Sequence, residues 1–95
     1  VLLVHGACFG PATMRTAADL IAPGARVLVP HRRGYGASPP ATTPPSVSDH
    51  VRDVIEVLDA HGVDRAVVAG VSGGATVGLA LALSHPDRVG AALLH

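Results

Sequence analysis

Lysine and tryptophan are absent from this 95-residue chain, and cysteine, methionine, tyrosine and phenylalanine occur once each. All seven basic residues are therefore arginines, and seven acidic residues balance them to a formal net charge of zero. Because nucleic-acid binders need clustered basic charge, this balance removes the electrostatic argument for a nucleic-acid partner. The single cysteine, Cys8, excludes a disulfide framework and a cysteine-rich zinc module.

Long hydrophobic runs are also lacking: none reaches the ~18 residues that cross a bilayer, so we expect no membrane partner. The six histidines are scattered without a His-x-x-x-His pair, and no metal site is predicted. Apolar residues nevertheless make up 48% of the chain and charged residues 15%, as in a folded domain. At this length the chain is one small domain, residues 1–95, or part of one. Its abundance of alanine, glycine and proline points to a GC-rich bacterial genome.

Short, continuously apolar segments alternate with helical patterns along the chain. Four of these segments predict buried strands, at residues 1–5, 26–30, 66–70 and 89–94. Helices are predicted at residues 13–22, 46–61 and 74–84. Continuously apolar strands are typical of a parallel sheet that is covered on both faces. The predicted fold is therefore α/β, a doubly wound parallel sheet of about four strands with three helices.

The segment from Ser46 to His61 carries the clearest helical pattern. Ser46 is placed to cap the helix, Asp49 lies in its first turn, and Gly62 suits a left-handed stop. Residues 31–45, which include two glycines and four prolines, predict a long loop. The apolar stripe of the helix consists of Val47, Val51, Val54, Ile55 and Leu58.

Both ends of the chain have the pattern of buried strands, Val1–Val4 at the start and Ala91–His95 at the close. A natural domain rarely begins and ends inside core elements, so we expect a fragment of a larger domain. The absence of a signal peptide then says nothing, and the cellular location stays open, with the cytoplasm favoured. Because cutting a sheet exposes an apolar edge, we expect the isolated chain to self-associate or to be partly unfolded.

A ligand site in an open parallel sheet lies at the carboxyl ends of the strands, where the winding direction reverses. We assume that strand 26–30 lies on one side of strand 1–5 and strand 66–70 on the other. The reversal then falls between strand 1–5 and strand 66–70. The loops at that point are Gly6-Ala7-Cys8 and Val71-Ser72-Gly73. We therefore expect these two loops to be neighbours.

The segment Gly70-Val71-Ser72-Gly73-Gly74 matches the pattern G-x-S-x-G of a nucleophile elbow. A strand that turns into a helix within one residue strains the backbone of that residue, so its neighbours two positions away must lack side chains. Gly70 and Gly74 meet this need, and Ser72 is then exposed at a helix N-terminus, where negative charge is favoured. The alternative is a glycine-rich phosphate-binding turn. Serine stands where the dinucleotide fingerprint needs glycine, however, and a P-loop needs a lysine that the chain lacks.

These features together resemble the α/β-hydrolase fold family, and the resemblance spans the whole chain. Residues 1–6 resemble the strand and His-Gly pair that open the family's oxyanion loop, and residues 31–38 are similar to its Asp-x-Arg-Gly-x-Gly-x-Ser loop. Gly70–Gly74 is the elbow, and residues 85–89 resemble the lead into the next strand. His31 stands where the family usually has aspartate, and this departure predicts the loss of a loop-anchoring interaction.

The resemblance implies a serine hydrolase that acts on an ester, amide or related acyl bond of a small molecule, without a cofactor. Ser72 would be the nucleophile, and the N–H groups of Gly73 and Ala7, or Cys8 in place of Ala7, would bind the oxyanion. His5, Gly6, Gly70 and Gly74 would support the elbow and the loop.

The family supplies its acid and its histidine base after the serine in chain order. Only His85, Asp87 and His95 are left after Ser72, and the first two precede a strand at the opposite end of the sheet. The resemblance therefore implies half a site, with no general base in these residues.

Several residues have alternative interpretations. His5 could act as the base, although bracing the loop is favoured, and Cys8 could be a nucleophile, although nothing nearby would lower its pKa. Arg32 and Arg33 could bind an anionic group, although a surface pair with one arm anchoring the loop is favoured. The acidic residues of helix 46–61 predict a solvated face. Two other functions stay open: a non-catalytic small-molecule binding module, and a lyase or haloperoxidase-like enzyme on the same fold.

Overall fold

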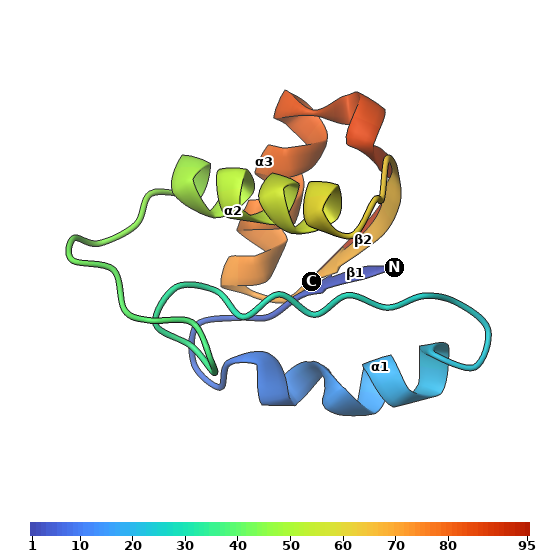
Figure 1. Ribbon diagram of the computed structural model, residues 1–95, viewed down its shortest axis with the longest axis horizontal. Coiled ribbons are helices and arrows are strands. Elements are labelled where there is room, and N and C mark those ends of the chain that lie inside the picture. The colour runs from blue at the N-terminus through green and yellow to red at the C-terminus, as the bar shows by residue number, and fades with distance from the viewer.

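The computed structural model describes all residues from Val1 to His95. It contains a small parallel sheet with helices on both sides (Figure 1). The strands are β1 (Leu2–Val4), β2 (Ala66–Gly70) and β3 (Val89–Leu94). The α-helices are α1 (Arg15–Ile21), α2 (Val47–Ala60) and α3 (Gly73–Ser84), and short 3-10 helices η1 (Pro11–Met14) and η2 (Pro86–Arg88) precede α1 and β3. The predicted α/β class is confirmed.

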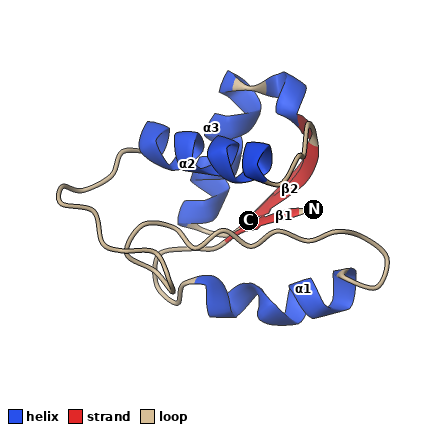
Figure 2. Ribbon diagram, in the orientation of Figure 1, coloured by secondary structure: helices blue, strands red, loops and turns tan.

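The sheet has the order β1-β2-β3, and both pairs are parallel. Figure 2 shows β1 and β2, in red, next to each other. Leu2 pairs with Val68 and Val4 with Gly70, so β1 and β2 end at the same edge. Leu28 makes an isolated parallel bridge to Leu2 on the other side of β1. The chain therefore winds to one side of β1 and then to the other, and the reversal lies between β1 and β2 as predicted.

The expected strand at residues 26–30 is reduced to that single bridge, so the sheet has three strands rather than four. Leu28 N–H donates to Val1 O at 2.8 Å, and Leu3 N–H donates to Leu28 O at 2.9 Å. The next bond of a parallel ladder would need an N–H from residue 30. Because Pro30 has no N–H, the ladder stops after Leu28.

The hydrophobic core lies between the sheet and the helices α2 and α3, whereas α1 lies on the opposite side of the strands (Figure 1). Leu2, Leu58 and Leu81, from β1, α2 and α3, are fully buried. The glycine at position 78 lets α3 approach the sheet closely, since a Cβ there would lie 2.8 Å from Leu94 Cδ2. Packing of α3 against all three strands fixes where its N-terminus points.

Helix α2 forms as its sequence predicts. Ser46 Oγ accepts from Asp49 N–H at 3.1 Å while the Asp49 carboxylate accepts from Ser46 N–H at 2.9 Å, which is a complete capping box. These hydrogen bonds hold the pKa of Asp49 below its usual value. Gly62, just beyond the helix, has a φ of 65°. Val51, Val54 and Leu58 are buried.

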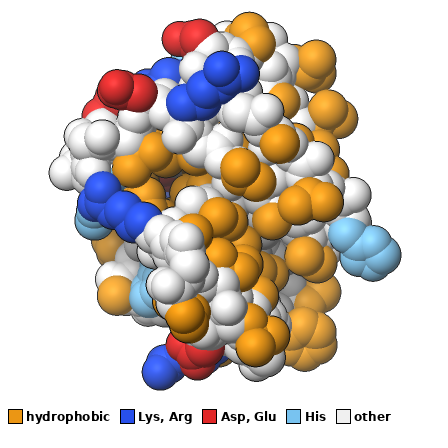
Figure 3. Space-filling view, turned by 90° about the vertical axis from the view of Figure 1, so that its right-hand side faces the viewer, with side chains coloured by type: hydrophobic (Ala, Val, Ile, Leu, Met, Phe, Trp, Pro, Cys, Tyr) orange, Lys and Arg blue, Asp and Glu red, His pale blue; other side chains and the backbone are white.

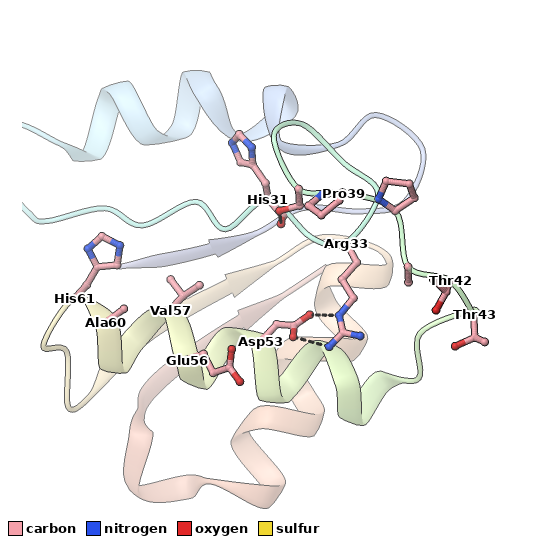
Figure 4. A pocket seen from close by; sticks show the side chains of 13 residues that line it. His31, Arg33, Pro39, Thr42, Thr43, Asp53, Glu56, Val57, Ala60 and His61 are labelled. Atoms are coloured by element: carbon pink, nitrogen blue, oxygen red, sulfur yellow. Dashed lines mark hydrogen bonds and ion pairs between the residues drawn. The ribbon is translucent and has the colours of Figure 1, made fainter.

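The acidic face of α2 is more than a solvated surface. Asp53 accepts from Arg33 Nε at 2.6 Å and from Arg33 Nη2 at 2.7 Å, a bidentate pair that ties the 31–45 loop to α2 (Figure 4). Asp59 similarly accepts from Arg88 at 2.7 Å. Between the loop and α2 lies a hollow of about 600 Å³ lined partly by His31, Arg33 and Asp53.

His31 anchors its own loop, so the predicted loss of an anchor at this position is wrong. Its Nδ1 accepts from Ala37 N–H at 2.9 Å, and Ser38 Oγ donates to its carbonyl oxygen. A neutral imidazole nitrogen can accept a backbone hydrogen bond as a carboxylate oxygen does, which is why the loop keeps its turn.

Much of the outer surface is apolar, and hydrophobic side chains spread over the face shown in Figure 3. Leu83 at the end of α3 and Leu93 in β3 are 75% and 68% exposed. None of the helices combines the length and the hydropathy that a membrane span requires.

Candidate active site

The junction between β2 and α3 holds the only non-glycine residue with a positive φ. Ser72 has φ 54° and ψ −122°, outside the regions that L-residues normally occupy. Such a backbone costs about 1–3 kcal/mol and persists only where the surrounding structure enforces it. The strand ends at Gly70 and the helix begins at Gly73, so the chain reverses its path within two residues.

Two glycines make this turn possible, as the sequence analysis predicts. A Cβ at position 70 would lie 2.7 Å from Gly74 C and closer still to Gly74 O. A Cβ at position 74 would lie 2.7 Å from His5 O and from Val4 C, and closer still to Val4 O. These contacts are with backbone atoms of the elbow and of β1, which cannot rotate away. Only glycine fits at both positions.

The loop after β1 lies against the elbow, so the predicted neighbourhood of the two loops is confirmed. A Cβ at Gly6 would lie 3.2 Å from Ser72 Cβ and 3.7 Å from Ser72 Oγ. A Cβ at Gly73 would lie 3.9 Å from Ala7 N. The N–H groups of Ala7, Cys8 and Gly73 donate to no acceptor in the chain. The loop after β1 and the first residue of α3 therefore both have backbone N–H groups without an acceptor near Ser72.

A cavity of about 430 Å³ opens beside Ser72. Its walls are largely apolar, and Phe9 is 80% exposed at its side. Gly6, Ala7, Cys8, Phe9, Thr13, Met14, Val71 and Ser72 line the cavity. Phe9 is therefore part of the wall of a pocket beside the loop that follows β1.

His5 braces the loop and has no free nitrogen for Ser72. Its Nδ1 lies 2.7 Å from Gly6 O, and its Nε2 accepts from Arg32 N–H at 3.2 Å. This pattern assigns the proton to Nδ1. The side chain is fully buried, and burial lowers its pKa, as does the nearby Arg32 charge. His5 therefore stays neutral and holds the 31–38 loop against β1.

The chain supplies no general base that is hydrogen-bonded to Ser72. Ser72 Oγ makes no hydrogen bond to another residue; its backbone N–H donates to His95 O at 2.7 Å. His85 and Asp87 lie before β3 at the other end of that strand, as the sequence predicts. No three His, Cys, Asp or Glu side chains come together at distances that would hold a metal ion.

Two further residues lie near the site. In the predicted pair of arginines, Arg33 anchors the loop through Asp53, whereas Arg32 is half-buried and its Nη1 donates to His5 O at 3.1 Å. His50 is buried, and its Nδ1 has no hydrogen-bond partner. A sequence signal for His50 exists, because its spacing to Val54 and Leu58 places it on the buried stripe of α2.

His50 predicts an acid-sensitive fold. Burial lowers its pKa, and Arg32 adds to this effect, so the unfolded chain takes up a proton more readily than the folded one. Stability is then complete above the unfolded pKa of about 6.5 and falls as the pH drops below it. Because an unpartnered buried polar group costs about 1–3 kcal/mol, His50→Leu is expected to raise the melting temperature at pH 7 by a few degrees and more at pH 5.5.

The measurement is thermal unfolding between pH 5 and 8. It uses the protein expressed from its natural reading frame, which is called the native-frame protein in the experiments below. His61→Gln, which changes an exposed histidine just after α2, is the control and should follow the wild type. A His50→Leu curve parallel to the wild type at every pH would contradict the prediction.

The fold and the elbow agree with a family comparison. The sequence model of the alpha/beta hydrolase fold family matches residues 1–95. The chain therefore belongs to the alpha/beta hydrolase fold family, as the sequence resemblance predicts.

Curated relatives are named hydrolases. A Caulobacter segnis protein provisionally named carbamate hydrolase RutD is 46% identical over 66 residues, covering 67% of this chain and 25% of that protein. An Azorhizobium caulinodans protein of the same provisional name is 36% identical over 89 residues, which cover 94% of this chain and 34% of that protein. Epoxide hydrolase B of Mycobacterium tuberculosis is 39% identical over 67 residues, which cover 68% of this chain and 19% of that protein. The chain thus spans between a fifth and a third of these relatives.

Solved structures show the same relation. An N-acyl homoserine lactone degrading enzyme superposes with a TM-score of 0.92 at 35% identity, over 99% of this chain and 37% of its own. A thermophilic esterase from Thermogutta terrifontis superposes with a TM-score of 0.93 at 26% identity, over 98% of this chain and 35% of the esterase.

Proposed function

We propose that these residues carry the nucleophile and the oxyanion-binding half of a serine hydrolase site that acts on an acyl bond. The observation that carries the proposal is the strained backbone of Ser72, a serine at a position where the elbow sterically favours glycine. A strained residue that could be glycine but carries a hydroxyl at a cavity mouth is best explained by the chemistry of that hydroxyl. The relatives named for carbamate and lactone chemistry support a substrate with an electrophilic carbonyl carbon.

In the proposed reaction Ser72 Oγ attacks the carbonyl carbon and gives its proton to a general base. The carbonyl oxygen becomes an oxyanion that accepts from the N–H groups of Gly73 and Ala7, with Cys8 N–H as the alternative to Ala7. Each such donor is worth roughly 2.7–4 kcal/mol in comparable enzymes. Collapse of the tetrahedral intermediate expels the alcohol or amine and leaves an acyl-serine. Water then attacks this ester and regenerates the hydroxyl.

The general base is proposed to come from outside these 95 residues. Both His5 nitrogens are occupied, and no other imidazole or carboxylate hydrogen-bonds Ser72 Oγ. The named relatives are three to five times longer than the matched region, which leaves room for the base. The isolated 95-residue chain is accordingly expected to show negligible turnover.

A fluorophosphonate probe tests the proposal. We expect the native-frame protein to gain one covalent adduct, found by mass spectrometry on the peptide that contains Ser72, because a phosphonyl group mimics the tetrahedral intermediate. Ser72→Ala should abolish labelling. Ser84→Ala, which removes an exposed serine at the end of α3, should label like the wild type.

If the fluorophosphonate does not label the native-frame protein, the hydrolase proposal is wrong. Ligand binding in the cavity without labelling would then favour the alternative of a non-catalytic small-molecule binding module on the same scaffold. A lyase or haloperoxidase-like activity would instead retain labelling at Ser72 but yield a product other than that of hydrolysis.

A further inference from the structure

We propose that Arg32 is the substrate-binding cation of this site and selects acyl substrates that carry a carboxylate close to the scissile carbonyl. The inference rests on the proposed function, since it specifies the substrate class for the same Ser72 site. It is carried by the position of the Arg32 guanidinium, its lack of an anionic partner and the character of its surroundings.

The Arg32 guanidinium ends beside the proposed oxyanion donors. A Cβ at Gly73 would lie 3.4 Å from Arg32 Nη1 and 3.9 Å from both Arg32 Nη2 and Ala7 N. One small volume is thus bordered by the guanidinium, by the Ala7 N–H and by the first residue of α3. A carboxylate bound by the guanidinium would therefore lie next to the oxyanion that the Ala7 and Gly73 N–H groups are proposed to hold.

Arg32 has no counter-ion within the chain. Its Nη1 donates to His5 O at 3.1 Å, its Nε is buried without a partner, and no carboxylate lies within 4.0 Å. Its Nη2 makes no hydrogen bond and is not among the buried unpartnered atoms, so it keeps contact with solvent. The Tyr35 ring lies 5.8 Å from its Cζ and supports one side of the guanidinium.

Loop anchoring does not explain the charge of Arg32. The neighbouring Arg33 performs that role through its bidentate pair with Asp53. A carbonyl acceptor such as His5 O could be satisfied by an uncharged donor. Because a partly buried charge is costly unless an anion compensates it, an unpaired guanidinium beside the N-terminus of α3 points to an anionic ligand.

No acidic side chain pairs with Arg32, and positive dipoles lie near it. The N-terminus of α3 contributes its dipole, Ala7 and Gly73 contribute free N–H groups, and His5 offers a neutral ring. A guanidinium binds a carboxylate through two N–H groups in a fixed plane, which favours a carboxylate over a neutral polar group. Since Arg32 lies beside the oxyanion donors, the carboxylate must be only one or two carbon atoms from the scissile carbonyl.

Two nearly matched esters test the proposal in the native-frame protein. Mono-4-nitrophenyl succinate carries a carboxylate on the acyl side, and 4-nitrophenyl butyrate has the same chain length without it. We expect wild type to favour the succinate ester by at least ~10-fold in kcat/KM. Arg32→Gln should lower kcat/KM for the succinate ester by about 100-fold, mainly through KM, and for the butyrate ester by less than about 3-fold. Arg32→Lys should restore part of the difference.

Controls separate charge recognition from structure. Arg15→Gln removes an exposed arginine of α1 and should leave both esters unchanged. If Arg32→Gln does not fold, the wild type still decides: added salt should raise KM for the succinate ester and leave the butyrate ester unaffected.

Equal losses on both esters, or a wild type that does not prefer the anionic ester, would overturn the assignment of Arg32. The outcome is distinct from a failure of the hydrolase proposal. Ser72→Ala must abolish hydrolysis of both esters if Ser72 is the nucleophile. Activity that depends on Ser72 but ignores substrate charge would refute only the role of Arg32.

Discussion

Ser72→Ala is expected to lower kcat/KM of the native-frame protein toward a 4-nitrophenyl ester by about 10⁴- to 10⁶-fold, the range known for removal of a hydrolase nucleophile. The loss is large because the free N–H groups of Ala7 and Gly73 can still bind the carbonyl oxygen but no atom can attack the carbon. The folded structure should be intact, since Ser72 Oγ makes no hydrogen bond within the chain.

Steady-state kinetics with both purified proteins make the comparison, and thermal unfolding checks that the variant is folded. Ser84→Ala serves again as the control, with unchanged kinetics expected. Residual activity of Ser72→Ala within about tenfold of the wild type would contradict a nucleophilic role, because water alone cannot replace a covalent step at that rate.

Gly74→Ala is expected to prevent folding of the native-frame protein or to cost more than about 4 kcal/mol of stability. The added Cβ would lie 2.7 Å from His5 O and from Val4 C, and closer still to Val4 O. Relief would require α3 to move away from β1, and this movement would open the core at Val77 and Leu81.

Soluble yield and chemical denaturation measure the effect. Gly90→Ala is the matched control, because the nearest atom to its added Cβ would lie at 3.6 Å, an ordinary contact distance. We expect this control to change stability by less than about 1 kcal/mol. A Gly74→Ala protein that melts within a few degrees of the wild type would show that the elbow does not need glycine at this position.

The sequence reveals most of the elements because their signals are local. The capping box at Ser46, the stripe of Val51, Val54 and Leu58, and the pattern around Ser72 each lie within a few residues. Such signals act before any tertiary contact forms, so a single sequence carries them. The position of the winding reversal is predicted only under an assumed strand order, and the order of the strands in the structure supplies that assumption.

The remaining features depend on contacts between distant residues. Whether residues 26–30 form a strand is decided by one missing donor, at Pro30, opposite Leu3. The acidic face of α2 acquires partners from Arg33 and Arg88, which lie 20 and 29 residues away. Nothing in the local sequence of Arg32 places its guanidinium beside Gly73 and His5 rather than in solvent. Pair interactions of this kind are set by the fold as a whole.

The positive φ of Ser72 lowers the stability of the fold, whereas its hydroxyl is the group that the proposed reaction needs. Glycine adopts a φ near 54° with little penalty, so Ser72→Gly would relax the backbone while deleting the hydroxyl. A population of variants screened for thermal tolerance alone would therefore drift toward glycine at position 72. Under the proposed role of Ser72, such glycine variants would be more stable but inactive, so a heat-based screen would need a separate assay of activity to keep the serine.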